Sequence, residues 1–413
     1  MMDRDSCGAN EKDEEVSAAM SLTGVRVLDF SRVLAGPYCT MMLAELGADV
    51  IKVEDPRGGD EAREWPPFVE GQSGYFFSVN RSKRSIALNL KAGESRRIVR
   101  DLAERSDVVV ENFAPGVTSR LGIDYGTLSA ANPHLVYCSI SGFGQTGPYR
   151  DKRAYDPILQ AMSGIMSVTG SRGGEPVKCG VAVTDVASAV FAAFAIAASL
   201  YRREKTGRGQ YIDLSMLDTG LSMMTFMGAM YLCAGEVPTT YGSENPTRVP
   251  SANYRTSDGR WVHVVINDRQ WPRFCELLGV PDLSTDPDFA NNRVRVANRD
   301  RVNAKIEERM RTRTAEEWIE LFDREGLPIG PVNSLDRILN DPHVLAREMV
   351  KSFDHPLAGK VRAIDMPYRF SETPSMIRNA PPLLGESTDS VLIELLGYSP
   401  EEVTRLRESG VIG

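Results

Sequence analysis

The chain has 413 residues, of which 42% are hydrophobic and 25% are charged, and its formal net charge at pH 7 is −8. This length exceeds what one simple core supports, so it predicts two domains or one large domain with a lobe. The composition excludes fibrous, collagen-like and largely disordered classes. The acidic balance argues against a general nucleic-acid-binding protein, which needs a basic surface.

Cysteines, histidines and long apolar runs exclude further classes. The six cysteines form no CxxC pair, so we expect reduced thiols and a cytoplasmic protein. The four histidines lack the short spacing of a zinc site. No run reaches the roughly 18 apolar residues of a membrane span, and we interpret the most apolar stretch, 186–201, as a buried helix. Residues 1–20 are polar and acidic, and we expect them to be a disordered leader.

From residue 22 onward, short apolar runs alternate with helical stretches. VRVLDF (25–30) has the composition of a buried strand, CTMMLAELG (39–47) has helical periodicity, and DVIKVE (49–54) is a second strand. Such a βαβ unit implies parallel strands joined by a right-handed crossover. The alternation continues with strands at 85–90, 107–113, 134–144 and 211–217, and with helices at 93–106, 127–132, 157–168 and 186–204. Residues 21–230 are therefore predicted to form a Rossmann-like α/β domain with a parallel sheet.

A shift in composition at 235–250, toward Gly, Pro, Thr and Ser, marks a linker. The following NYRTSDGRWVHVVIN predicts a hairpin that turns at Asp258–Gly259. Helical stretches come next, at 268–278, 293–312 and 314–325. We therefore expect a linker and a smaller domain over 231–330, and a return to the large domain over 331–413.

Three loops carry residues that suit a ligand. SRVLAGP (31–37) follows the first strand, where a doubly wound sheet binds its ligand, although a simple turn is an equally open interpretation. It is not GxGxxG, so a nicotinamide cofactor is not indicated. NRSKRS (80–85) suits a phosphate-rich ligand, with a solvated turn as the commoner interpretation. ENFAPG (111–116) presents the Asn112 amide and the Phe113 ring at a strand end, with a place in the core as an equally open interpretation of Phe113.

Asp185 stands at the start of the long apolar stretch 186–204. An aspartate in this position commonly serves as a helix cap or first-turn acid. Alternatively, a carboxylate against an apolar wall is less solvated and becomes a better nucleophile toward a thioester. No GxSxG elbow or P-loop offers a competing site. The residues alone leave both roles of Asp185 open.

Eight segments occur in order between residue 22 and the C-terminus: VRVLDFSRVLAGPYCTMMLAELGADVIKVE, NRSKRSIALNLK, DVVVENFAPG, SISGFGQTGPY, AYDPILQAMSGIMSVTG, VAVTDVASA, KTGRGQYIDLSMLD and PPLLGESTDSVL. Together they resemble the class III coenzyme A transferases (CaiB/BaiF type), which include formyl-CoA transferase and the succinyl-CoA:dicarboxylate CoA-transferases. The resemblance implies a Rossmann-like large domain built from both ends of the chain and a smaller α+β domain in the middle. It also implies ring-shaped subunits that interlock as a homodimer.

The resemblance assigns the catalytic role to Asp185. By analogy, Asp185 attacks an acyl-CoA, forms an acyl–aspartyl anhydride and then an aspartyl-CoA thioester, and passes CoA to a small carboxylic acid. The substrates implied are coenzyme A esters and carboxylic acids, without a tightly bound cofactor, a metal, nucleic acid or a membrane. The family's CoA-binding positions correspond to Arg32, Val33, Leu34, Ala35, Leu88, Asn112, Phe113, Arg120 and Arg153.

Departures from the family patterns bear on the substrate and the reaction. Leu34 stands where formyl-CoA transferase has glutamine, and no glycine-rich lid is evident in 235–260, so a formyl/oxalate pair is doubtful. Tyr155 stands where the related α-methylacyl-CoA racemases have a histidine base, 30 residues before Asp185, and a tyrosine is a poor base near neutral pH. Transfer is therefore favoured over racemisation, with a non-catalytic CoA-binding relative as a further alternative. The overall likeness is greatest to succinyl-CoA-dependent members that act on dicarboxylates. Arg248 is a candidate for binding a distal carboxylate, although a linker cation is its commoner role.

Overall fold

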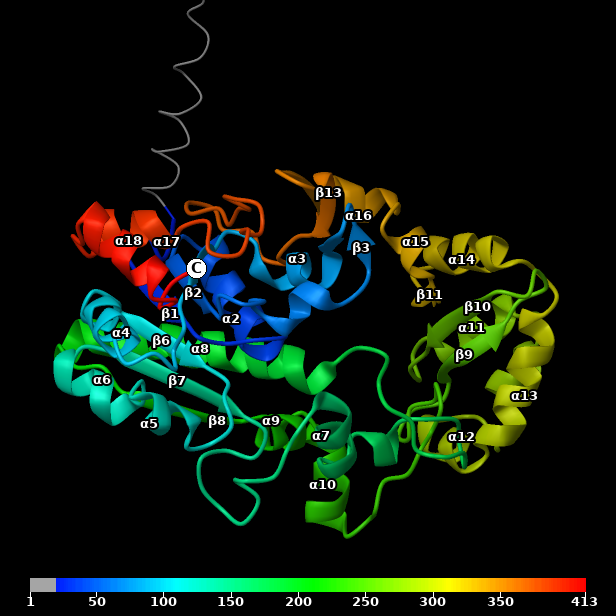
Figure 1. Ribbon diagram of the computed structural model, residues 1–413. Coiled ribbons are helices and arrows are strands. Elements are labelled where there is room, and N and C mark those ends of the chain that lie inside the picture. The colour runs from blue at the N-terminus through cyan, green and yellow to red at the C-terminus, as the bar shows by residue number, and fades with distance from the viewer. Residues whose placement is uncertain (1–19) are drawn as a thin grey trace, which may run out of the picture. The chain divides into compact units, whose positions relative to one another are not determined.

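The computed structural model describes residues 20–413, so nearly all of the expected leader (1–20) lies outside the described part. The chain divides into two units (Figure 1). Unit 1 consists of the residues up to Ile165, Cys179–Thr225 and Leu345–Gly413, and unit 2 of Met166–Lys178 and Phe226–Val344. The last segment of unit 1 thus begins at Leu345 and not directly after residue 330, where β11 (Ile329–Pro331) still pairs with β10 (Trp261–Val265) of unit 2.

A six-stranded parallel sheet forms the centre of unit 1, in the order β5–β2–β1–β6–β7–β8. The chain first builds outward from β1 to β2 and β5, and then adds the remaining strands on the other side of β1. This is the doubly wound order that the alternating pattern predicts, with its switch point between β1 and β6. The strands are β1 (Arg26–Asp29), β2 (Asp49–Glu54), β5 (Arg84–Ala87), β6 (Val108–Glu111), β7 (Val136–Ser141) and β8 (Tyr211–Ser215).

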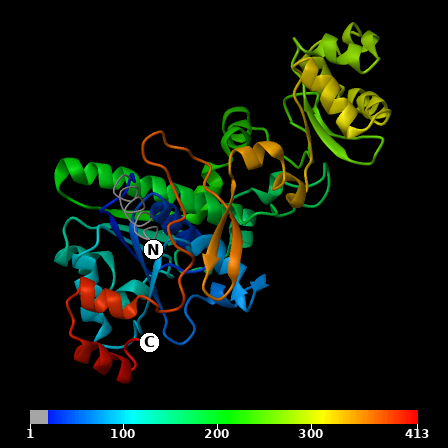
Figure 2. The same cartoon turned by 90° about the horizontal axis from the view of Figure 1, so that it is seen from above.

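Helices cover both faces of this sheet, which is why its strands are apolar throughout. On one face, α2 (Ala35–Glu45) and α8 (Val183–Thr206) pack against residues such as Val27 and Val110. On the other face, residues such as Val109 pack against α4 (Ser95–Glu104), α6 (Tyr125–Ala131) and α18 (Pro400–Glu408). Figure 2 shows α8 and α18 on opposite sides of the strands.

The helix α8 has the length and composition of a membrane span, with 24 residues and a mean hydropathy of 1.8 over its most apolar window. One such helix is weak evidence for a membrane protein, because core helices of soluble proteins share these properties. Ala189, Ala192 and Ile196 of α8 are fully buried in the core that α2 completes. Phe194 points away from that core and is 74% exposed.

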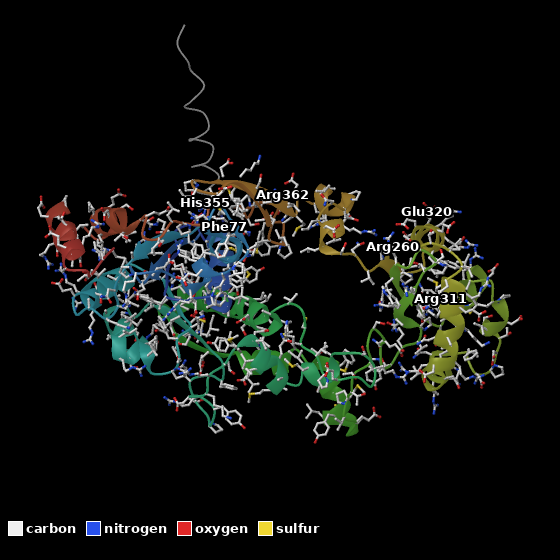
Figure 3. All side chains as sticks on the ribbon, turned by 45° about the vertical axis from the view of Figure 1, so that its right-hand side comes forward. Phe77, Arg260, Arg311, Glu320, His355 and Arg362 are labelled. Atoms are coloured by element: carbon white, nitrogen blue, oxygen red, sulfur yellow. The ribbon has the colours of Figure 1, made fainter. Side chains whose placement is uncertain are left out.

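Further elements of unit 1 lie outside this sheet and the helices that cover it. The helix α3 (Gly74–Asn80) packs against a hairpin formed by β12 (Val350–His355) and β13 (Gly359–Ile364), neither of which the sequence pattern predicted. Figure 3 shows His355 of this hairpin beside Phe77 of α3, with ring centroids 4.6 Å apart. The other elements are β3 (Phe68–Val69), β4 (Gln72–Ser73), α5 (Val117–Leu121), α7 (Asp156–Met162), α9 (Met216–Ser222), α16 (Pro342–Ala346) at the junction with unit 2, α17 (Thr388–Ser390), and the short helical turns Glu61–Glu64, Met166–Val168 (in unit 2) and Val391–Leu395.

Unit 2 has its own core beneath a small antiparallel sheet, in the order β11–β10–β9. The strands β9 (Ser251–Arg255) and β10 form the predicted hairpin, and Gly259 in its turn has a φ of 79°. Trp271, Phe274 and Trp318 fill the core and are almost fully buried. The helices are α10 (Thr225–Ala234), α11 (Trp271–Leu277), α12 (Asn292–Ala297), α13 (Arg299–Met310), α14 (Ala315–Arg324) and α15 (Leu335–Ile338), with a short helical turn at Pro281–Ser284.

Candidate active site

The loop 31–37 connects β1 to α2 at the switch point of the sheet. Asn112, which follows β6, accepts a hydrogen bond from the backbone N–H of Arg32 (2.9 Å) and donates one to its carbonyl (2.8 Å). Val33 has a left-handed φ of 68°, and its N–H lies 3.2 Å from each carboxylate oxygen of Asp60. A β-branched residue adopts this conformation only where its surroundings impose it. The loop is therefore held in a defined, strained shape.

A cavity of about 270 Å³ lies beside this loop. The guanidinium of Arg32 stacks over the Phe113 ring, 4.7 Å from its centroid, and forms part of the cavity wall. The combination of apolar walls and cationic side chains suits a ligand that has both an apolar part and phosphate groups. The lining residues include Phe30, Arg32, Asp60, Leu88, Leu90, Lys91, Phe113 and Arg120.

The cavity gathers four of the nine residues predicted to bind CoA: Arg32, Leu88, Phe113 and Arg120. Asn112 acts through the backbone of the loop, as described above. Val33, Leu34 and Ala35 belong to the same loop and the start of α2 but do not line the cavity. Arg153 is exposed, just before α7, and does not line it either. Arg248 is exposed in unit 2.

Asp185 lies in the first turn of α8 and is partly buried. Burial, with a further contribution from the negative charge of Asp156, raises the pKa of the Asp185 carboxyl to about 7. Within residues 20–413, the carboxylate of Asp185 has neither a hydrogen bond nor an ion pair. The charges of Asp185 and Asp60 both act on Tyr75 of α3, whose pKa rises to about 12, mainly through burial.

Asp156, the first residue of α7, fixes the start of α8. Its carboxylate accepts hydrogen bonds from the Thr184 N–H (2.9 Å), the Thr184 hydroxyl (2.6 Å) and the Gln160 amide (2.7 Å). The residue that precedes α8, Ala182, has no side chain to cap the helix, so Asp156 supplies the cap from a neighbouring helix. The adjacent Tyr155, by contrast, is 74% exposed.

The segment NRSKRS does not form a patch for a phosphate group, nor is it a solvated turn. Arg81 pairs with Glu45 (2.8 Å) and Lys83 with Asp29 (3.1 Å), and all four side chains are buried. Arg84 pairs with Asp49 at the opposite end of the sheet. The phosphate interpretation was wrong because these cations neutralise buried carboxylates of the protein itself.

Sequence reasoning missed Asp60, Tyr75, Lys91 and Asp156. A signal existed for Lys91, which follows β5 at the ligand edge of the sheet, and for Asp156, which directly precedes Pro157 in the first turn of a predicted helix. Asp60 and Tyr75 lie in irregular or short elements, where periodicity gives no information.

Comparisons with known proteins identify the family of the chain. The family model described as CoA-transferase family III matches residues 22–388. The chain is 41% identical to a mouse protein named succinyl-CoA:glutarate CoA-transferase, over 95% of this chain and 90% of that one. It is also 41% identical to a protein of Haloarcula marismortui named succinyl-CoA:mesaconate CoA-transferase, over 91% and 96% of the two chains.

Among solved structures, a CaiB/BaiF family protein from Brucella suis matches with a TM-score of 0.82 and 38% identity, over 91% of this chain and all of that one. The family resemblance that the eight sequence segments suggested is thereby confirmed. The chain belongs to CoA-transferase family III.

Proposed function

We propose that this CoA-transferase moves coenzyme A between carboxylic acids through covalent intermediates on Asp185. The observation that carries the proposal is the state of this side chain. The Asp185 carboxylate is partly buried and has no partner among residues 20–413, and its pKa of about 7 makes it more nucleophilic than an ordinary aspartate that is ionised at the same pH. A carboxylate that served only as a helix cap would instead be engaged in hydrogen bonds, as Asp156 is.

In the proposed reaction, an Asp185 oxygen attacks the thioester carbonyl of the donor. The C–S bond breaks, which gives an acyl–aspartyl anhydride and a CoA thiolate. The thiolate then attacks the aspartyl carbonyl, which releases the donor acid and leaves an aspartyl-CoA thioester. The acceptor carboxylate repeats these two steps in reverse order, forms its own CoA ester and regenerates the Asp185 carboxylate. Every step exchanges one acyl bond for another, so the protein must mainly exclude water, which hydrolyses anhydrides.

For the CoA moiety, we propose the cavity beside loop 31–37. Leu88 and Phe113 offer apolar contacts, and Arg32 and Arg120 offer cations for phosphate groups. Val33, Leu34, Ala35 and Asn112 contribute through the shape of the loop. Arg153 stays in this set on the family resemblance alone.

For the substrates, we propose succinyl-CoA or another dicarboxylyl-CoA as donor and a dicarboxylic acid as acceptor. The names of the relatives from mouse and Haloarcula marismortui support this class. A panel of succinyl-CoA with glutarate, mesaconate, oxalate and monocarboxylic acids, analysed by mass spectrometry for new CoA esters, identifies the acceptor. Preferred transfer to oxalate would contradict the inference drawn from Leu34.

Hydroxylamine trapping tests the covalent mechanism. With succinyl-CoA present, hydroxylamine is expected to convert residue 185 into a hydroxamate that peptide mass spectrometry locates, because it cleaves the aspartyl thioester or anhydride. The Asp185→Asn variant should lose transfer by at least a thousandfold and remain unlabelled. Asp218→Asn is the matched control, because Asp218 occupies the same first-turn position in α9 but is exposed.

The two alternatives predict different outcomes. A racemase-like enzyme would scramble a 2-methylacyl-CoA of defined configuration without transferring CoA, and no hydroxamate would form. A non-catalytic relative would bind CoA and do neither. An active enzyme that is never labelled at residue 185 would refute the covalent mechanism.

We further propose a cytoplasmic, interlocked homodimer. Apolar side chains that an isolated chain leaves in water support the dimer: Val190, Phe191, Phe194 and Tyr201 of α8 are each at least 46% exposed. No residue of α10 is buried either. Exposed apolar surface of this kind marks protein–protein contacts.

A further inference from the structure

Two lysines lie fully buried beneath the loop 31–37, where neither reaches solvent. Lys52 belongs to β2 and stands beside Asp29 of β1 in the register of the sheet. Lys83 directly precedes β5, and its side chain is 0% exposed. Burying an ammonium group is costly unless it is paired and hydrogen-bonded. The hydrogen-bond partners of the two ammonium groups therefore indicate the role of each lysine.

Each lysine reaches a backbone carbonyl at one end of the loop. The Lys52 ammonium donates to the Ser31 carbonyl (2.7 Å) and to Asp60 (2.9 Å). The Lys83 ammonium donates to the Pro37 carbonyl (2.9 Å), to Asn80 (2.9 Å) and to Asp29 (3.1 Å). These three acceptors match the three N–H donors of an ammonium group.

The paired carboxylates hold the same loop by its amides. Asp29 accepts a hydrogen bond from the Ser31 N–H (2.9 Å), and Asp60 accepts from the N–H of Val33, the residue with left-handed φ. The loop is thus held at Ser31 and Pro37 by the lysines and, between them, by the carboxylates that the lysines neutralise. An ion pair that only stabilised the fold would not require hydrogen bonds to the backbone at both ends of one loop, such as those to the Ser31 and Pro37 carbonyls.

We propose that Lys52 and Lys83 are positioning residues that keep the loop 31–37 in the conformation that binds coenzyme A. The inference rests on the proposed function, in which this loop borders the CoA site. Neither lysine is assigned a contact with the reacting atoms. Lys52 also lines the cavity itself, whereas the effect of Lys83 passes through the backbone of residues 31–37, and with it through Arg32 in the cavity wall.

The test compares Lys83→Met with the double variant Asp29→Asn/Lys83→Met. The single variant leaves a buried carboxylate unpaired and is expected to be unstable. The double variant removes both charges, keeps acceptors for Ser31 and regains thermal stability, but still lacks the contact to the Pro37 carbonyl. Arg84→Met is the matched control, because it removes a salt bridge of the same segment at the far end of the sheet.

Calorimetric titration with free CoA gives the first readout. We expect the Kd of the double variant to rise at least tenfold while its melting temperature stays near that of the wild type, and the Kd of Arg84→Met to stay unchanged. A double variant that is stable and binds CoA like the wild type would overturn the proposal.

Hydrogen–deuterium exchange of the unliganded protein gives the second readout. Peptides that cover 31–37 should exchange faster in the double variant but not in Arg84→Met, and equal exchange would also overturn the proposal. If the wild type does not bind CoA at all, the proposed function fails, whereas the exchange experiment still tests whether Lys83 holds the loop.

Discussion

Two carboxylates, those of Asp156 and Asp185, lie at the start of α8 and differ in their surroundings. Asp156 accepts three hydrogen bonds, which fix the helix end. Asp185 has none within the described residues, and the charge of Asp156 adds to the effect of burial on it. The proposed nucleophile thus differs from the helix-capping aspartate by the hydrogen bonds that neighbouring residues supply to the latter.

The pKa of Asp185 predicts how activity depends on pH. Only the ionised carboxylate attacks a thioester, so kcat/KM should rise with pH up to about 7 and then level off. Asp156→Asn removes the neighbouring negative charge, which lowers the pKa of Asp185 and moves the rising limb toward lower pH. Rate profiles of both proteins between about pH 5 and pH 9 check this. A limb that does not move would show that Asp156 does not influence the ionisation of Asp185.

At the scale of residues, the sequence predicted the location of a side chain where its partners are close in the chain or lie at the ligand edge of the sheet. Arg32 and Phe113 follow strands, so their meeting at the ligand edge was foreseeable. The burial of Lys83 was not, because Asp29 lies 54 residues away and no local pattern distinguishes a buried cation from a solvated one.

At the scale of elements, α8 illustrates how a helix is bounded by its surroundings. Its N-terminus is capped by a side chain from α7, and its C-terminus by Gly207, which has a φ of 66°. Gly209 follows and passes so close to the preceding strand connection that a Cβ would lie 2.0 Å from the Leu135 carbonyl oxygen. The two glycines of this short turn are therefore needed for different reasons: Gly207 for its positive φ, and Gly209 for the close approach of two backbone segments.

Alanine substitutions at these glycines should separate the two reasons. In Gly207→Ala, the added Cβ has no atom within 4 Å, and only the positive φ is unfavourable. We therefore expect a loss of about 1 kcal/mol in the free energy of unfolding. Gly209→Ala forces the backbone apart and should cost more, roughly 2–4 kcal/mol. Urea denaturation of both variants measures the difference. A larger loss for Gly207→Ala would contradict this account.

The sequence predicted the strands of the parallel sheet and its long helices because buried strands and long helices carry strong hydrophobic periodicity. It missed α3 and the hairpin of β12 and β13. These elements are short, and the hairpin carries Lys351, Lys360 and Arg362 among its residues, so its apolar signal is weak. They are stabilised by contacts with each other, such as that between Phe77 and His355.

At the scale of the whole molecule, each unit has its own apolar core, yet the chain passes between the units more than once. Hydrophobic periodicity cannot report such crossings, because it reflects local burial and not which core a residue joins. This is why the sequence placed the return at residue 330 and overlooked the passage of Met166–Lys178 through unit 2.

The proposed homodimer is testable on the outer face of α8. Phe194→Asp places a charge where we expect a second copy to pack, so the particle mass measured by light scattering should fall to that of one chain. Leu357→Asp, at an exposed apolar residue in the turn of the β12–β13 hairpin, is the control and should keep the wild-type mass. A wild type that is already monomeric, or a Phe194→Asp variant that stays dimeric, would contradict this dimer surface.

The buried pair of Asp29 and Lys83 also has a consequence for synthesis on the ribosome. When Asp29 leaves the exit tunnel, its cation lies 54 residues further along and has not yet been translated. Until then, Lys52 of β2 is the cation that the sheet places beside Asp29, and the hydrogen-bonded ion pair with Lys83 is still missing. We therefore expect the carboxylate of Asp29 to gain its full set of partners, and this half of the sheet its final stability, only after residue 83 has emerged during co-translational folding.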